Sequence, residues 1–183
     1  MSRVTPMRRL LAGLALASAA VAGRVRAQEP TTEFGVDLGI KWRKSSGGGS
    51  AVLQIQTPVD VRVAFFLPGR TAFEPRFTAL FLSVAGRSVY SLDPGLNVLM
   101  PLPGGTYNRG GYLTAGVDVA ISGGSGLGTG AAYTLNLGPG LRRPLGRAAV
   151  RGEAFVGYTP KQGTTVPEGY FTLGARLGLS FFD

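Results

Sequence analysis

The chain has 183 residues, and it contains neither cysteine nor histidine. These two absences exclude a disulfide framework, thiol catalysis, the commonest metal ligand and the usual general base. Nineteen basic residues against ten acidic ones give a net charge of +9, but no basic stripe with interleaved aromatics exists, so we expect no nucleic-acid partner.

The first 27 residues have the pattern of a secretory signal peptide. A start with three arginines is followed by an apolar core of 13 residues, Leu10–Ala22. Val25 and Ala27 then supply small residues at the two positions that define cleavage. We predict cleavage after Ala27, with a cut after Ala22 as the alternative, and a single barrel domain over residues 28–183. Five arginines leave with the leader, so the basic count falls to 14 and the mature net charge is +4.

Eight segments of the mature chain alternate apolar and polar residues, which indicates β-strands with two different faces. The eighth is the clearest, because alternation persists over the eleven residues from Phe171 to Phe181. That length suits a tilted strand that crosses a bilayer, which takes roughly 9–11 residues. The predicted strands cover Phe34–Arg43, Ala51–Phe66, Thr71–Val84, Ser88–Pro101, Tyr112–Ile121, Thr129–Arg142, Ala148–Tyr158 and Tyr170–Asp183.

Mostly short connections rich in Gly, Pro and Ser join these segments. An even number of strands places both ends of the domain on one side, which would be the periplasm. The fold class we predict is therefore all-β, an eight-stranded antiparallel up-and-down transmembrane barrel. The predicted outer connections are Lys44–Ser50, Gly86–Arg87, Ser122–Gly128 and Thr159–Glu168, and the periplasmic ones are Leu67–Arg70, Leu102–Gly111 and Arg143–Arg147.

Four prolines, Pro58, Pro75, Pro94 and Pro139, fall inside the predicted strands. Each removes a hydrogen bond from a strand pair, and a closed barrel has no edge on which to place it. Bulges are one solution. A turn at Asp93-Pro94-Gly95 is another, and it would change the strand count.

The polar row of the strands carries six basic and six acidic residues. Buried charges must pair, and an eight-stranded barrel is just wide enough for side chains to fill it. We therefore predict a salt-bridged network that plugs the lumen. Its predicted members are Asp37, Lys41, Asp60, Arg62, Glu74, Arg76, Asp93, Asp118, Arg142, Arg151, Glu153 and Arg176.

Aromatic residues fall at strand ends on the apolar row, which is typical of the two girdles of a membrane barrel. A soluble barrel would turn the same apolar row inward. The predicted outer girdle is Trp42, Tyr90, Tyr133, Tyr158 and Phe171, and the predicted periplasmic girdle is Phe34, Phe65, Phe73 and Phe181.

The C-terminal run resembles the β-signal of outer-membrane proteins at Thr172, Gly174, Leu177, Leu179 and Phe181. It departs from that pattern in one respect, because Phe182 and Asp183 follow the aromatic position. With the leader and the eight strands, the chain resembles the small OmpA/OmpX-like outer-membrane barrels of Gram-negative bacteria. The resemblance implies insertion by the barrel-assembly machinery and an exposed loop surface. We also expect a location in the cell outer membrane, outer-membrane lipids and lipopolysaccharide as partners, and a monomer.

The function we expect is structural or surface-interacting and non-enzymatic, without a cofactor or a metal. A narrow porin-like channel is one alternative, and a soluble periplasmic barrel that binds a lipid or small apolar ligand is another. A third is a membrane enzyme similar to the small-barrel acyltransferases and deacylases, but those families use a histidine, which this chain lacks.

Overall fold

The computed structural model describes residues 31–48, 51–84, 87–125, 127–163 and 166–183. The predicted signal peptide and its cleavage site lie outside these ranges. Within them, the structure contains no helix that is both long enough and apolar enough to cross a membrane.

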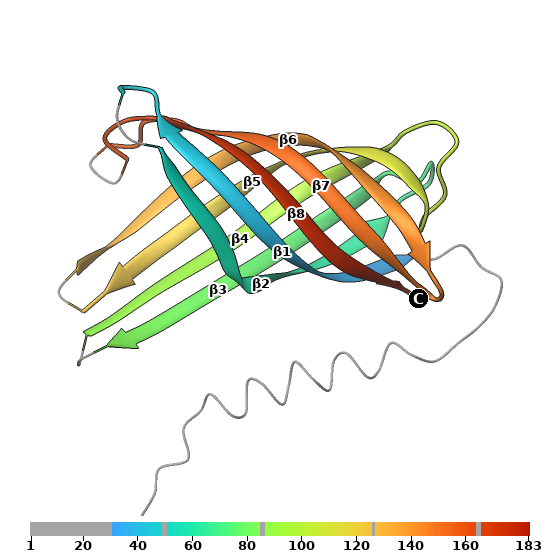
Figure 1. Cartoon of the computed structure of the whole chain (residues 1–183), viewed down its shortest axis with the longest axis horizontal. Coiled ribbons are helices and arrows are strands. Elements are labelled where there is room, and N and C mark those ends of the chain that lie inside the picture. Colours follow the sequence, from blue (N-terminus) through green and yellow to red (C-terminus); the bar gives the residue numbers. More distant parts are fainter. Residues whose placement is uncertain (1–30, 49–50, 85–86, 126, 164–165) are drawn as a thin grey trace, which may run out of the picture.

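Eight strands form one closed barrel in which each strand is antiparallel to its neighbours in the sequence (Figure 1). The first and last strands close the barrel over a long register, from Glu33 opposite Phe182 to Ser45 opposite Tyr170. The predicted eight-stranded antiparallel barrel is thus confirmed. The strands are β1 (Thr32–Ser45), β2 (Val52–Phe66), β3 (Ala72–Val84), β4 (Arg87–Pro101), β5 (Gly110–Gly124), β6 (Leu127–Leu145), β7 (Ala148–Thr159) and β8 (Tyr170–Phe182).

The strands extend further at several ends than the sequence pattern indicated. β5 continues to Gly124 and β6 begins at Leu127, so the predicted Ser122–Gly128 loop is much shorter. We call this end of the barrel, on the left of Figure 1, the loop end, and the opposite end, which holds the C-terminus, the terminal end.

Side chains alternate between the wall's two faces along each strand, as the pleat requires. In β8, Thr172, Arg176 and Ser180 are buried inside the barrel, while Leu173 and Leu177 are exposed on its outside. The apolar row therefore faces outward and the polar row inward.

The proline positions explain interruptions in the strand pairing. In an antiparallel sheet, a residue's N–H and C=O point toward the same neighbouring strand, so a proline weakens one pairing and leaves the other intact. Pro94 pairs with Phe77 of β3, whereas the β4–β5 register has no partners between Leu92 and Gly95. Pro139 likewise pairs with Leu113 of β5 and lies at a gap toward β7.

The other two prolines follow the same logic on β2 and β3. Pro75 pairs with Leu96 of β4 and lies at a gap toward β2. Pro58 lies where the β1–β2 register shifts. Asp37 pairs with Asp60 and Gly39 pairs with Gln56, so β2 has extra residues between these two pairs. Pro94 is inside a strand and not in a turn, so the strand count remains eight.

The wall is not equally paired along its length. The β2–β3 register runs from Phe66 opposite Ala72 to Val61 opposite Phe77, and no pair of described residues continues it toward the loop end. Both strands continue beyond that point, β2 paired with β1 and β3 paired with β4. In Figure 1 the β1–β2 and β3–β4 hairpins diverge at the loop end. We call this unpaired stretch between β2 and β3 the seam.

Candidate functional site

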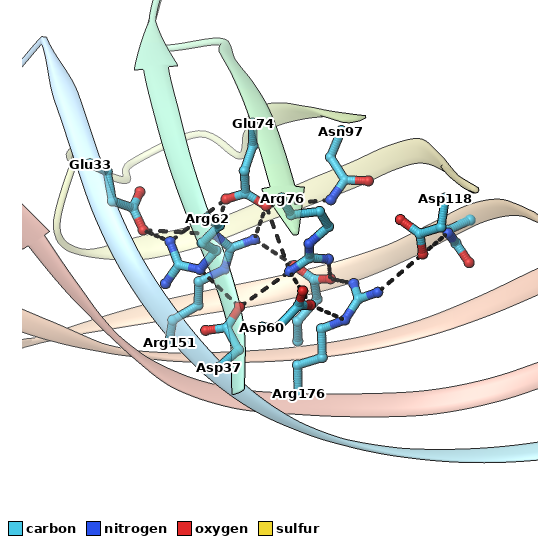
Figure 2. A network of polar contacts seen from close by, with 12 residues as sticks. Glu33, Asp37, Asp60, Arg62, Glu74, Arg76, Asn97, Asp118, Arg151 and Arg176 are labelled. Carbon is cyan, nitrogen blue, oxygen red and sulfur yellow. Dashed lines mark hydrogen bonds and ion pairs between the residues drawn. The ribbon is translucent and has the colours of Figure 1, made fainter. Parts of the chain in front are cut away.

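The candidate site is the interior of the barrel, where charged side chains from seven of the eight strands meet. Eleven of them form one continuous set of ion pairs, each linked to at least one other within 4 Å. We call this set the lumen network. Its members are Glu33, Asp37, Asp60, Glu74, Asp118 and Glu153 with Arg62, Arg76, Arg142, Arg151 and Arg176. Figure 2 labels all of them except Arg142 and Glu153.

Arg151 of β7 and Glu74 of β3 link opposite walls of the barrel. The guanidinium donates to both oxygens of the Glu74 carboxylate, through Nη1 to Oε2 and through Nη2 to Oε1 at 3.1 Å. Its Nη2 also donates to Glu153 Oε2 at 2.7 Å. Glu74 is fully buried and Arg151 is 1% exposed. This two-pronged geometry is the strongest form of a carboxylate–guanidinium pair.

Arg62 occupies the part of the network nearest the terminal end. It donates to Glu33, to Asp37 Oδ2 at 2.8 Å and to Ser180 Oγ at 2.8 Å. Ser180 in turn donates to Glu33 Oε1 at 2.6 Å. Arg142 binds the other oxygen of Glu33 at 2.6 Å. The Glu33 carboxylate, at the start of β1, is thus held by side chains from β2, β6 and β8.

Arg76 and Arg176 extend the network toward the loop end. Arg76 Nη2 lies 3.2 Å from Asp37 and 3.3 Å from Asp60. Arg176 donates to Glu153 Oε1 at 2.7 Å and lies 3.5 Å from Asp118. Figure 2 shows the Arg76 and Arg176 guanidinium groups among the carboxylates that they contact.

Inward-facing glycines make the space that the network occupies. A β-carbon at Gly35 would overlap the Arg62 guanidinium, and one at Gly178 would overlap the Asp37 carboxylate. The ring of Tyr112 likewise lies over Gly140, and the ring of Phe155 over Gly174. Eleven charged side chains fit inside eight strands because these opposing positions lack side chains.

An apolar layer lies next to the network, toward the terminal end of the barrel. Ala64, Ala72, Leu99 and Tyr112 are buried there, and Phe66 packs against them. Phe66 also stacks on Phe182, with ring centroids 6.4 Å apart. The Tyr112 hydroxyl donates to Glu153 at 3.2 Å, so this residue joins the apolar layer to the charges above it.

The lumen is hollow on the side of the network that faces the loop end. A small cavity of about 40 Å³ lies against Arg76 and Arg176, and a wider mouth of about 410 Å³ leads from it to the loop end. Arg43, Asp93 and Tyr170 line both parts. We call the two parts together the recess.

Ten of the twelve predicted network residues are brought together, and two are not. Lys41 and Asp93 were predicted to pair, but no described residue of opposite charge lies within 4 Å of either. Asp93 instead accepts a hydrogen bond from Ser91 at 2.9 Å. Both residues line the cavity of the recess, above the network, because they lie nearer the loop end of their strands.

Glu33 and Tyr112 are two interior residues that the predicted network does not include. The predicted first strand starts at Phe34 and so leaves Glu33 out, yet β1 begins at Thr32 and Glu33 is fully buried. Its spacing from Asp37 places both on the inner row, and that spacing was a usable signal. Tyr112 was not singled out because an aromatic side chain on a polar row gives no such signal.

The outer surface carries the apolar residues in a continuous belt. Leu53, Phe81 and Leu177 are 64%, 63% and 63% exposed. All predicted girdle residues except Tyr90 are exposed at the two strand ends. Tyr90 is half-buried, with its hydroxyl 3.2 Å from that of Thr129. The exposed girdle residues are Trp42, Tyr133, Tyr158 and Phe171 at the loop end and Phe34, Phe65, Phe73 and Phe181 at the terminal end.

The residues of the proposed β-signal lie on β8, which pairs with β1 to close the barrel. Thr172 and Gly174 face inward, while Leu177, Leu179 and Phe181 face outward. The side-chain carboxylate of Asp183 accepts hydrogen bonds from the backbone N–H of Thr32 at 2.9 Å and from the Thr32 hydroxyl at 3.0 Å. Recognition by an assembly machinery remains a prediction.

Arginines lie beside all six carboxylates of the lumen network. A general acid or base must be free to exchange a proton with a substrate, and each of these six carboxylates lies within 4 Å of at least one guanidinium. The described residues include no group of three or more side chains that is suited to hold a metal ion.

No protein-family model matches the chain, and no curated protein matches it significantly in sequence. Among solved structures, Neisserial surface protein A (NspA) is similar over 82% of this chain and 96% of its own, with 12% identity and a TM-score of 0.46. Ail, the attachment invasion locus protein of Yersinia pestis, is similar over 84% of this chain and 100% of its own, with 13% identity and a TM-score of 0.44. In complex with the heparin analogue sucrose octasulfate, Ail gives a TM-score of 0.47 at the same identity.

Proposed function

We propose that this chain is an outer-membrane β-barrel protein that is closed to solutes and acts as a structural or surface-interacting component, without enzymatic activity. The observation that carries the proposal is the inverted arrangement of its side chains. Eleven paired charges lie inside the barrel, and a belt of leucines and aromatics covers its outside.

The outer belt is incompatible with water as the surrounding solvent. Soluble monomers rarely expose continuous apolar patches larger than a few hundred Å². Here every strand presents exposed large apolar residues, from Phe34 and Leu38 on β1 to Leu177 and Phe181 on β8. A membrane barrel has this belt with aromatic girdles at its two rims, and its closed strand pairing satisfies the backbone within lipid. The exposed belt therefore disfavours the soluble, ligand-binding alternative.

The lumen network supports a closed barrel over a narrow channel. Arg62, Glu74 and Arg151 are at most 1% exposed, and the apolar layer around Leu99 and Tyr112 lies below them. A permeating ion would have to displace these buried charge pairs. With the terminal end closed, contact with partners would occur through the loop end and the lipid-facing surface.

Cell fractionation with heat-modifiable gel migration tests the location. We expect the protein in the outer-membrane fraction, with a folded form that migrates differently before and after boiling. Recovery from the soluble periplasmic fraction would contradict the membrane assignment and favour the soluble barrel.

Single-channel recording in planar bilayers tests the plug. The native protein should show no conductance, and Arg151→Ala, which removes a central cation, serves as a positive control for a loosened lumen. Steady ion-selective conductance by the native protein would support the porin-like alternative and refute the closed lumen.

A further inference from the structure

Arg143 of β6 is a charged residue on the outer, apolar face of the barrel wall. Its neighbour Arg142 is buried and pairs with Glu33 inside the lumen, and successive side chains of a strand point to opposite faces. Arg143 is exposed, and so are Leu141 and Leu145, two residues to either side of it, at 47% and 58%. The arginine therefore lies within the outer apolar row near the terminal end, and not beyond that row.

A second arginine lies beside it. Gly110 of β5 pairs with Arg142 of β6, so the same register carried one residue further brings Arg109 next to Arg143. The backbone of Arg109 is fixed in a small hairpin, because its N–H donates to the Thr106 carbonyl at 3.3 Å and its carbonyl accepts from the Thr106 N–H at 2.6 Å. Arg109 is exposed as well. Two arginines thus meet where β5 begins and β6 ends, at a place that we call the rim corner.

The rim corner has no anionic partner within the protein. Neither an ion pair nor a side-chain hydrogen bond joins Arg109 or Arg143 to another described residue. Arg147, in the turn after β6, is exposed and equally unpaired. Among the described residues, Asp183 is the exposed carboxylate of this end, but it is bound to Thr32 of β1, on the side of β8 away from β7. Adjacent like charges on a sheet repel, so the rim corner favours an anion from outside the chain.

The surroundings of the rim corner indicate which kind of anion binds there. Leu141 and Leu145 flank the Arg143 guanidinium along the strand, and the Leu102 side chain lies over Gly111 beside them. A soluble phosphate or an acidic protein segment would neutralise the arginines and leave these leucines uncovered. A lipid provides both a charged head and apolar chains, and long cationic side chains reach a head group while their stems stay against apolar surface.

Resting on the membrane location proposed above, we propose that the rim corner is a binding site for an anionic phospholipid. Arg109 and Arg143 hold its phosphate, because a guanidinium matches phosphate oxygens with two parallel hydrogen bonds. The acyl chains lie against Leu141 and Leu145. In the predicted topology this end of the barrel faces the periplasm, so the lipid would come from the periplasmic leaflet.

Quenching of a tryptophan by brominated lipids tests this assignment. With Trp42→Phe as background, Leu141→Trp places a reporter beside Arg143. Phe34→Trp places a matched reporter on β1, where the outer row is apolar from Phe34 to Trp42. The protein is folded into vesicles of phosphatidylcholine and phosphatidylglycerol, in which one lipid or the other is brominated on its chains. Both leaflets have the same composition, so the result does not depend on the direction of insertion.

We expect the Leu141→Trp reporter to show a preference of about fivefold or more for phosphatidylglycerol, since even one arginine near an anionic lipid surface supplies about that factor. The Phe34→Trp reporter should show a preference below about twofold. Arg109→Gln with Arg143→Gln should bring the first reporter down to the level of the second. The matched pair Lys44→Gln with Lys161→Gln removes the same charge from exposed positions at the loop end and should leave the preference unchanged.

Equal preference at the two reporters, or a preference indifferent to Arg109 and Arg143, would overturn the lipid site. A preference near one at both reporters would leave these arginines to a soluble acidic partner. Unbrominated phosphatidic acid in the same vesicles should reduce the quenching, whereas glycerol 3-phosphate in solution, a head group without chains, should not. Displacement by glycerol 3-phosphate would refute the lipid source. Failure of the membrane proposal looks different, because brominated phosphatidylcholine would then quench neither reporter and no heat-modifiable form would appear.

Discussion

Replacing Arg151 with methionine tests whether the lumen network is a dry, interdependent structure. The change keeps most of the side-chain volume but removes the two-pronged contact with Glu74 and the 2.7 Å contact with Glu153. The buried carboxylates of Glu74 and Glu153 are then left with fewer cations near them. Breaking a buried pair from one side costs about 3–5 kcal/mol, and we expect Arg151→Met to lower the free energy of unfolding by that amount.

The double variant Glu74→Gln with Arg151→Met removes both charges of the pair. Its loss should be smaller than the sum of the two single losses, because residues in one network show coupling energies of roughly 0.5–3 kcal/mol. Urea unfolding in lipid vesicles, followed through the emission of Trp42, the single tryptophan, measures these values. Arg147→Met, at an exposed turn position, is the matched control and should change stability by about 0.5 kcal/mol or less. If Arg151→Met costs no more than this control, the lumen is hydrated and the network argument fails.

Three further predictions concern the wall. Leu177→Arg should reduce the folded fraction in vesicles, by about 2–4 kcal/mol if the site lies near the bilayer centre, whereas Leu177→Ala should fold normally. Gly140→Val should abolish the heat-modifiable form, because its side chain would overlap the Tyr112 ring, and Gly152→Val, with open space around it, should not. Gln162→Ala removes both hydrogen bonds to the Tyr133 backbone and should speed its amide hydrogen exchange roughly two- to tenfold. Unchanged exchange of the Tyr133 amide hydrogen would show that the Gln162 side chain does not protect it.

The strands and their faces were predictable because one periodicity governs both. Alternation assigned inner positions such as Asp37 and Arg176 and outer ones such as Leu177 before any strand was paired. Alternation could not assign how far along the barrel axis an inner residue lies, because all inner residues of a strand look equivalent in sequence. Lys41 and Asp93 were therefore placed in the network, whereas their positions near the loop end keep them above it.

The prolines show what periodicity leaves out. Nothing in the local sequence states which neighbouring strand a residue's N–H faces, so Pro75 and Pro94 looked equally disruptive to both of their pairings. The register decides this: each proline lies at a gap in one pairing and opposite a partner in the other. The seam also depends on register, and no single strand indicates it.

Average composition conceals the segregation that defines this molecule. A charged fraction of 16% and a mean hydropathy of +0.18 fit a soluble β-domain as well as a membrane barrel. Six of the ten acidic residues of the chain lie in the lumen network, however, so the outer wall holds few charges of either sign. In water this arrangement would bury charges at a cost and expose apolar surface at a further cost. In a bilayer, exposing the apolar belt becomes favourable, and pairing the buried charges limits the cost of burying them. The same strands therefore make physical sense only with lipid around them.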